Sequence, residues 1–418
     1  MNKNEVIELG NYILNVNPIT NNLYGKIYFA KDNKGNKYAV KKINLSEFQN
    51  ITIKNEFIKE IKMSYKLNNI HIVKLLDVVK SKKNIYCFFE YCDGQTLQSF
   101  CDNYISKFSQ LIPFNIIQKF SKEIIEGLSY MSRKKYVYRN LKLENIMLSS
   151  NSKKKYEENE YLKNLFLQEN ILDDIILKES ANVQYQENIL MKEKNFEKIT
   201  QLLDNYTIKL IDLSIGKDLS KENDLKTFCG NPLTMAPEIW GLKLGKNKNY
   251  NDKSDLWSLG VLLYYFAFNT FPFNGDSHMN IYNNIINGDY IIKKRNQLTI
   301  EFVDLICGLL KINVNLRYDY NILINHPFFT KQFNELKPFI FKDDENEILL
   351  NANSDKKFLN KINISKKNIV EPNETLDDEY KDKFINRIFF TDCEIIDFIV
   401  NTKESEKDWI VIELNENL

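Results

Sequence analysis

The sequence lacks the closely spaced cysteine pairs on which disulfide frameworks and zinc sites are built. It has six cysteines and three histidines in 418 residues, and no cysteine has a partner at metal-ligand spacing. This argues against a disulfide-rich secreted protein and against a zinc module. A reducing, cytoplasmic environment is the prediction.

The chain also lacks an excess of charge of either sign. Its 57 basic side chains are balanced by 56 acidic ones, so no overall attraction to nucleic acid or to an anionic membrane is expected. The N-terminus has no apolar run ending in small residues and carries Asn2 where myristoylation needs glycine. Neither a signal peptide nor a myristoylation site is predicted.

Long apolar runs are scarce, and one reaches transmembrane length. Leu256–Phe273 reads LWSLGVLLYYFAFNTFPF, which leaves a membrane helix and a buried core helix as alternatives. Asp255 precedes the run, and Ser258 and Asn269 interrupt it. These polar positions favour a helix buried in a large domain, so no membrane span is expected.

The periodicity of apolar residues divides the chain into two parts. Between Ile7 and Glu90, short alternating runs predict strands around one helix, Asn55–Leu67. Between Leu97 and Phe329 the runs lengthen and become helical. The predicted strands are Lys26–Lys31, Lys37–Ile43 and Asn84–Glu90, and the clearest later helices are Phe114–Met131 and Phe302–Leu310. An α+β protein with a small sheet lobe and a larger, mainly helical lobe is the prediction.

Two polar segments interrupt this plan. Residues 149–206 are rich in Asn, Lys and Glu and predict a surface insertion, which either serves as a docking element or has no function. Residues 330–418 form a C-terminal tail that ends in the strand-like stretch Asp408–Leu414. The sequence does not decide the oligomeric state.

Four motifs follow one another in a specific order. They are YVYRNLKLENIML at Tyr136–Leu148, IKLIDLS at Ile208–Ser214, TFCGNPLTMAPEIW at Thr227–Trp240 and NDKSDLWSLGVLLYY at Asn251–Tyr265. Together they resemble the catalytic loop, metal-binding loop, activation segment and anchoring helix of eukaryotic protein kinases. The resemblance covers residues 12–329 outside the insertion. It implies a bilobal kinase fold around a nucleotide cleft, with a small lobe at about 12–92 and a large lobe at about 93–329.

The kinase resemblance assigns a set of ATP-binding residues. Alternation in YAVKKI places Lys41 on the cleft face of its strand, where the family lysine holds the α- and β-phosphates. Glu60 fits its helical partner better than Glu56 does. The remaining implied contacts to the nucleotide are Gly25, Ile27, Ala39, Phe89, Glu90, Cys92 and Met147. Ordinary core packing predicts the same apolar residue types at Ile27, Ala39, Phe89 and Met147.

The resemblance also implies a magnesium site. Asn145 and Asp212 stand where the family places its two metal ligands, and Lys142 stands where a lysine meets the γ-phosphate. Mg-ATP is therefore the expected cofactor.

The sequence departs from the kinase pattern at the catalytic base. Where the family has His-Arg-Asp, this chain has Tyr138-Arg139-Asn140. The amide of Asn140 cannot accept the proton of a substrate hydroxyl. Loss of a positioned base costs on the order of 10²- to 10⁴-fold in rate, so slow transfer stays possible.

Further departures surround the expected phosphate and substrate positions. The phosphate-covering loop keeps only Gly25, with Thr20 and Asn22 at the two other glycine positions. Ser214 replaces the glycine of Asp-Phe-Gly, and Asn231 replaces a substrate-facing threonine. A looser grip on ATP and a restricted loop switch are expected.

Two other positions bear on binding and regulation. Thr96 replaces an acidic residue often used for ribose, which again lowers the expected nucleotide affinity. Thr227 lies where kinases are often phosphorylated, and Arg139 is retained where such a phosphate is received.

The residues that hold the kinase large lobe together are kept. They are Glu238 of Ala-Pro-Glu, its expected ion-pair partner Arg317, and Asp255 of the anchoring helix. Within the superfamily, EYCDGQTL, FCGNPLTMAPEIW and EKDWIVIE resemble the autophagy-initiating ULK kinases and their pseudokinase relatives.

Three hypotheses follow for the function. The chain is a pseudokinase that binds Mg-ATP and regulates or scaffolds a protein partner, with impaired transfer to protein Ser/Thr. Alternatively, it is an active or weakly active ULK-like serine/threonine kinase that acts on a protein substrate. The third hypothesis is an interaction module that binds no nucleotide.

Overall fold

The structure is a computed structural model of the 418-residue chain. It describes residues 6–22, 25–150, 203–219, 230–243, 245, 250–341, 345–354 and 409–412. The chain divides into two compact units, one formed by residues 1–62, 74–91 and 359–418 and the other by residues 63–73 and 92–358. Thr227, Cys229, most of the insertion and residues 355–408 of the tail lie outside the described residues.

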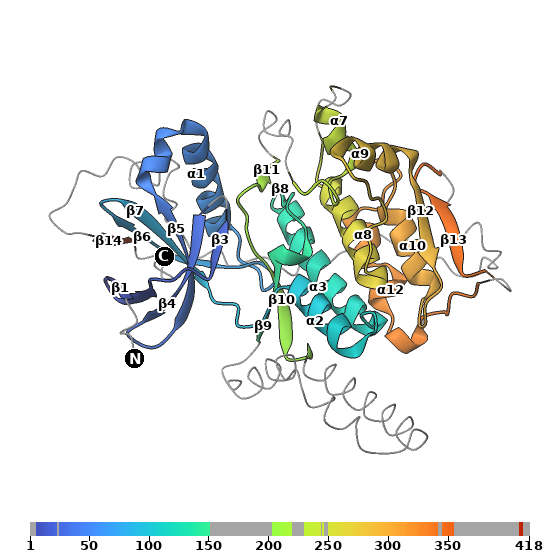
Figure 1. Ribbon diagram of the computed structural model, residues 1–418, viewed down its shortest axis with the longest axis horizontal. Coiled ribbons are helices and arrows are strands. Elements are labelled where there is room, and N and C mark those ends of the chain that lie inside the picture. Colours follow the sequence, from blue (N-terminus) through green and yellow to red (C-terminus); the bar gives the residue numbers. More distant parts are fainter. Residues whose placement is uncertain are drawn as a thin grey trace, which may run out of the picture. The chain divides into compact units, whose positions relative to one another are not determined.

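The first unit contains an antiparallel sheet (Figure 1). Its strand order is β1-β2-β4-β5-β7-β6-β14, with β3 paired to β4. The strands are β1 Val6–Leu9, β2 Tyr12–Asn15, β3 Thr20–Asn22, β4 Gly25–Asp32, β5 Lys37–Asn44, β6 Leu75–Ser81, β7 Asn84–Glu90 and β14 Trp409–Ile412. The three strands predicted from alternation lie at the centre of this sheet.

The two faces of this sheet bury different clusters, as the period-two alternation requires. Helix α1 (Ile51–Lys66) packs Phe57 and Ile61 against Ile43 and Cys87 on one face. The other face buries the cluster of Leu9, Leu14, Tyr28, Ala30, Val40, Val79, Tyr86 and Phe88. Because both faces are apolar, the positions of α1 and of the β1–β2 hairpin are fixed by burial.

One edge of the sheet is completed by a strand from the far end of the chain. β14 pairs antiparallel with β6, with Val411 opposite Val79 and Trp409 opposite Ser81 (Figure 1). The strand-like pattern at Asp408–Leu414 therefore marks a real strand, which joins the first unit.

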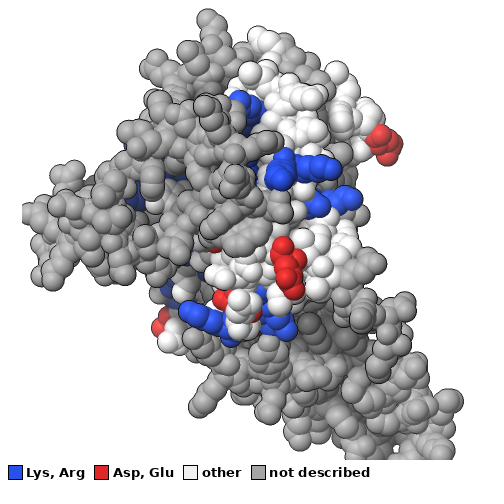
Figure 2. Space-filling model, turned by 90° about the vertical axis from the view of Figure 1, so that its left-hand side faces the viewer, with Lys and Arg blue, Asp and Glu red and all other residues white. Residues whose placement is uncertain are grey.

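Charged groups of both signs are spread over the described part of the first unit. Figure 2 shows basic side chains scattered among acidic ones, without a single continuous basic patch on that part of the face. Lys42 lies over the rings of Tyr28 and Tyr86, with Nζ 5.8 and 5.9 Å from the ring centroids. Such cation–π contacts keep the aliphatic stems packed while the charges remain near the surface.

The second unit is mainly helical (Figure 1). Several helices begin at residues whose side chains accept a backbone N–H, such as Thr96, Ser277, Thr299 and Asp319. The helices are α2 Leu97–Phe108, α3 Phe114–Arg133, α7 Pro237–Lys243, α8 Lys253–Phe268, α9 His278–Asn287, α10 Ile300–Leu309, α11 Tyr320–Ile324 and α12 Pro327–Thr330, with the short 3-10 turns η2 Leu143–Asn145 and η3 Phe333–Glu335.

Helix α8 is the buried centre of this unit. It packs against α3 and α10, and a Cβ at Gly260 would come within 2.8 Å of the Leu309 Cβ, so α8 and α10 approach closely there. The helix ends at Phe268 because Asn269 adopts a left-handed conformation, with φ of 50°. In the described part of the chain, no helix has the length and apolarity that crossing a membrane requires.

Three two-stranded ribbons complete the second unit. β8 (Tyr136–Val137) pairs with β11 (Lys217–Asp218), β9 (Ile146–Ser150) with β10 (Tyr206–Leu210), and β12 (Asp289–Lys293) with β13 (Glu347–Asn351). Ser150 and Tyr206 are direct cross-strand partners, so the ends of the insertion are adjacent. β13 lies in the segment predicted as tail and pairs within the second unit.

Candidate functional site

In the first unit, a buried lysine on β5 meets a buried glutamate on α1. Lys41 Nζ lies 2.7 Å from both Glu60 carboxylate oxygens, and the two side chains are only 9% and 6% exposed. Phe57 and Ile61 turn this side of α1 toward the sheet, whereas Glu56 is exposed. The structure thus pairs Lys41 with Glu60.

The other expected nucleotide-binding residues of this unit lie near Lys41 on the same sheet. Ile27 is directly opposite Lys41 across β4 and β5, and Ala39 is opposite Phe89 across β5 and β7. Direct cross-strand partners and residues two apart share a face, so these four side chains line one side of the sheet. Gly25 begins β4 opposite Asn22.

Glu90, expected at the hinge, ends β7. Its backbone N–H donates to the carbonyl of Lys74, and its carboxylate accepts the Lys74 N–H at 2.8 Å. These two bonds hold the end of β7 in the first unit.

In the second unit, the chain at residues 94–96 runs beside β9. Thr96 bridges Met147, and the Gly94 N–H donates to the Leu148 carbonyl at 3.0 Å. A Cβ at Gly94 would lie 2.6 Å from the Leu148 carbonyl oxygen, so only glycine permits this approach. Cys92, just before it, is buried.

Thr96 has a structural role of its own. Its hydroxyl oxygen accepts the Ser99 N–H at 3.1 Å and so caps α2. A helix cap accounts for a threonine at this position.

The loop that carries Tyr138, Arg139 and Asn140 is anchored by Asp255. The Asp255 carboxylate accepts the N–H groups of Tyr138 and Arg139, each at 2.7 Å. This support holds Arg139 at a φ of 63°, a conformation that residues other than glycine seldom adopt. Burial raises the pKa of Asp255 to about 7, although the two N–H bonds act to lower it.

Tyr138, at the position of the family histidine, joins two loops through its side chain. It is fully buried, and its hydroxyl donates to the carbonyls of Ile211 and of Asn145, the latter at 3.3 Å. These contacts link the catalytic-loop position to the metal-loop position.

Asn140, Asn145 and Asp212 come together. The Asn140 side-chain amide donates from Nδ2 to Asp212 Oδ2 at 2.9 Å. The Asn145 amide donates to the Asn140 backbone carbonyl at 3.0 Å. Asp212 has a φ of 59°, and its Oδ1 accepts the Ser214 N–H at 3.3 Å. The structure thus places the expected base position, Asn140, in contact with each of the two expected metal ligands.

This donor set fits magnesium only in part. Asp212 supplies one carboxylate and Asn145 one amide oxygen, which are suitable hard ligands. One Asp212 oxygen already accepts an N–H of Asn140. Among the described residues no cluster of three acidic, histidine or cysteine ligands exists.

The other departures have separate local environments. The Ser214 hydroxyl is buried and has no hydrogen-bond partner among the described atoms. The Asn231 side chain accepts the Leu233 N–H at 3.0 Å, which closes a local turn. Lys142 lines one small cavity together with Asn231 and Tyr265.

Arg139 is engaged within the second unit. Its Nε donates to the Ile215 carbonyl at 2.6 Å, its Nη1 donates to the Tyr250 hydroxyl, and its guanidinium carbon lies 6.0 Å from the centroid of the Tyr250 ring. Sequence reasoning missed this tyrosine because no motif places it near Arg139. The phosphate-receiving role of Arg139 stays a prediction, since Thr227 lies outside the described residues.

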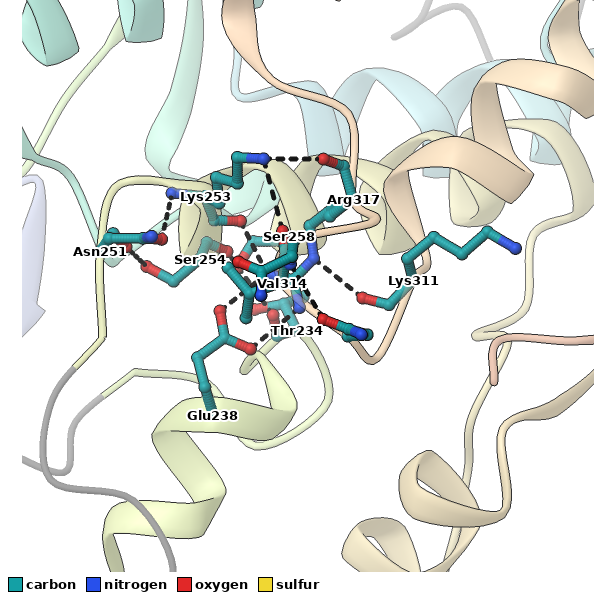
Figure 3. Close-up of polar contacts among 11 residues, drawn as sticks. Thr234, Glu238, Asn251, Lys253, Ser254, Ser258, Lys311, Val314 and Arg317 are labelled. Atoms are coloured by element: carbon teal, nitrogen blue, oxygen red, sulfur yellow. Dashed lines mark hydrogen bonds and ion pairs between the residues drawn. The ribbon is translucent and has the colours of Figure 1, made fainter. Parts of the chain in front are cut away.

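The expected scaffold ion pair is present and densely bonded (Figure 3). Arg317 makes two parallel bonds to Glu238, at 2.7 and 2.9 Å, and also donates to the carbonyls of Lys311 and Lys253. Its guanidinium lies 5.2 Å from the Trp257 ring. Paired and bonded in this way, the buried charge of Arg317 is well compensated.

A family model for the protein kinase domain matches residues 21–159 and 185–329. The chain belongs to the protein kinase family. The kinase lobes predicted from the sequence correspond to a sheet unit with one long helix and to a helical unit.

Among curated proteins, the chain is similar to serine/threonine kinases. It is 25% identical over 310 residues to the serine/threonine-protein kinase ATG1a of Arabidopsis thaliana, covering 73% of this chain and 40% of that protein. It is 26% identical to a putative serine/threonine-protein kinase, R517/R518, of Acanthamoeba polyphaga mimivirus, covering 74% and 61%. Against the serine/threonine-protein kinase ATG1 of Pichia angusta the identity is 25%, covering 73% and 35%.

These kinase relatives are longer than the matched region. The chain spans about 40% of ATG1a and 61% of the mimivirus protein. The predicted resemblance to kinases of the ATG1/ULK type is confirmed at about 25% identity.

Proposed function

We propose that this kinase domain binds ATP and acts mainly as a regulatory or scaffolding pseudokinase toward a protein partner. The observation that carries the proposal is the contact between Asn140 and Asp212. At the position of the general base, an amide N–H points at a carboxylate. A group that donates there cannot accept the proton of a substrate hydroxyl.

ATP binding is proposed from residues at the kinase family's nucleotide and metal positions. Lys41, already paired with Glu60, supplies a positive charge for phosphates, beside the apolar positions Ile27 and Ala39. Asp212 and Asn145 supply oxygen ligands for a magnesium ion, which would neutralise phosphate charge when bound. Of the three glycine positions of the phosphate-covering loop, only position 25 holds a glycine. We therefore expect the affinity for ATP to be weak.

Thermal-shift measurement tests ATP binding directly. A ligand that binds only the folded state raises the melting temperature, so ATP is expected to raise it in the wild type and not in Lys41→Ala. An unchanged melting temperature at saturating ATP would support the nucleotide-free interaction module instead.

A radiolabelled-phosphate assay tests whether phosphoryl transfer to protein is impaired. Turnover well below about 1 s⁻¹ is expected for the wild type, with a large gain in Asn140→Asp if the missing base is the main defect. Wild-type turnover near ordinary kinase rates would overturn the pseudokinase proposal.

The second candidate is a working serine/threonine kinase. It is favoured by the assembled Lys41–Glu60 pair and by the names of the similar proteins. In that case positioning and electrostatic stabilisation carry the transfer without a strong base. Wild-type activity that depends on both Lys41 and Asp212 would support it.

A reducing compartment such as the cytoplasm remains our proposal for the location. Four described cysteines, Cys87, Cys92, Cys101 and Cys307, are buried thiols outside any disulfide.

A further inference from the structure

Asp212 accepts hydrogen bonds from two neutral donors. Its Oδ2 accepts the Asn140 amide at 2.9 Å and its Oδ1 accepts the Ser214 N–H at 3.3 Å. Both donors belong to the second unit, and both are neutral. Within the described part of that unit, the charge of Asp212 is thus met by hydrogen bonds from neutral groups.

Asn140 is itself fixed in place on the other side. Its backbone carbonyl accepts the Asn145 amide, and the preceding Arg139 N–H is held by Asp255. The Asn140 amide thus approaches Asp212 from a loop that is anchored independently of the contact.

The contact also supports an uncommon backbone conformation. Asp212 has a φ of 59°, which a residue with a Cβ adopts only when its surroundings compensate for the cost. The two hydrogen bonds to its carboxylate, one to each oxygen, provide such compensation.

A carboxylate at position 140 would turn the attraction between this position and Asp212 into repulsion. At the same separation, two negative oxygens would face each other at about hydrogen-bond distance, and they would repel unless a proton or a cation lay between them. The amide supplies an N–H in the place where that cation would be needed.

We infer that Asn140 is a positioning residue that replaces a divalent cation as the partner of Asp212, so that this site is held in order without metal. The inference concerns the site of the proposed function but does not rest on nucleotide binding. It gives the Asp-to-Asn departure a structural purpose in addition to its catalytic cost.

Melting temperatures in EDTA and in excess magnesium chloride, at matched ionic strength, test the inference on the full chain without nucleotide. The wild type is expected to melt at the same temperature in both. In EDTA, Asn140→Asp is expected to melt at least about 3 °C below its own melting temperature in magnesium. The reason is that a bound cation relieves the repulsion between the carboxylates at positions 140 and 212. Asn140→Ala, which removes the donor without adding charge, is the control: it loses stability and gains no response to magnesium.

The inference would be overturned if magnesium raised the melting temperature of the wild type as much as that of Asn140→Asp. It would also be overturned if magnesium left the melting temperature of Asn140→Asp unchanged. If Asn140→Asp does not fold, manganese binding by the wild type decides. Electron paramagnetic resonance is expected to show the Mn²⁺ free in solution, and retention at one site per chain would overturn the inference.

The same measurements separate this inference from the proposed function. If ATP fails to raise the melting temperature while Asn140→Asp still shows its magnesium response, ATP binding is wrong and the role of Asn140 stands. If ATP raises the melting temperature of the wild type while Asn140→Asp without nucleotide shows no response to magnesium, the inference fails and the proposed function remains.

Discussion

Single buried charges in this protein are held by several partners each. Arg317 donates to a carboxylate and to two carbonyls, and Asp255 accepts two backbone N–H groups. A buried ion that loses one partner is left poorly solvated, which is why such residues are sensitive to conservative changes. The two following predictions use this sensitivity.

Arg317→Lys is expected to lower the free energy of unfolding by about 3 kcal/mol. A lysine ammonium cannot make the two parallel bonds to Glu238 or reach the Lys311 carbonyl in the same way. Urea denaturation measures the loss. Lys331→Ala is a matched control, because Lys331 is 40% exposed and lies 3.6 Å from Glu301, and such a pair contributes under about 1 kcal/mol. Equal losses in the two variants would contradict the prediction.

Asp255 is expected to make stability depend on pH. Burial raises its pKa in the folded state to about 7, above its value in an unfolded chain, so the folded state binds the proton more tightly. The contribution of Asp255 to the free energy of unfolding is therefore fully present at low pH and is lost as the pH rises through 7.

The free energies of unfolding of the wild type and of Asp255→Asn, compared between pH 5 and pH 8, measure this contribution. The difference, wild type minus variant, is expected to fall with rising pH by up to about 1.4 kcal/mol per pH unit. A difference that stays constant or rises would show that the two N–H bonds outweigh burial.

Residue-level predictions from sequence were strongest where a motif fixes spacing. The motif brought Asn140, Asn145 and Asp212 to one place, and helix periodicity selected Glu60 over Glu56. The motif did not indicate that the Asn140 amide donates to Asp212, because the spacing of residues does not specify the rotation of their side chains. The contact between Arg139 and Tyr250 was missed since Tyr250 lies outside any motif.

Elements with strong periodicity were predicted within a few residues. The helix expected at Phe114–Met131 spans Phe114–Arg133, and the strand at Asn84–Glu90 has those bounds. The apolar run Leu256–Phe273 extends past the end of the helix, because Asn269 ends α8 at Phe268. Strand β13 was missed, since a five-residue alternation inside a polar tail is a weak signal.

β14 is expected to stabilise the first unit although it lies at the far end of the sequence. Deleting residues 409–418 removes its four cross-strand pairs with β6, worth about 2 kcal/mol in all. The measurement is the melting temperature together with the rate of proteolysis of the first unit. Deleting only residues 413–418 keeps the strand and is the control. If both deletions behave alike, the pairing contributes nothing to stability.

At the scale of the whole molecule, the division into a sheet unit and a helical unit followed from the change of periodicity. The partners of distant segments did not follow, because register between strands far apart in sequence depends on packing. This is why the pairings of β14 and β13 were not predicted.

The insertion is expected to be dispensable for the fold of the second unit. Ser150 and Tyr206 are cross-strand partners, so a short Gly-Ser linker in place of residues 151–202 spans the gap. The shorter loop costs less closure entropy, by roughly 2 kcal/mol, and the melting temperature is expected not to fall. Extending the deletion to residues 151–205 also removes the buried Leu203 and serves as the destabilised control. If the variant with a linker in place of residues 151–202 no longer unfolds cooperatively, the insertion belongs to the core.

The pairing of β14 with β6 sets an order of events during synthesis on the ribosome. Residues 82–408 are made after β6 and before β14, which takes on the order of tens of seconds at ordinary rates of translation. For that time the nascent sheet has a bare edge of unpaired N–H and C=O groups. Chaperones that recognise extended strands would have their best access to this kinase domain in that interval, while the helical unit is already emerging.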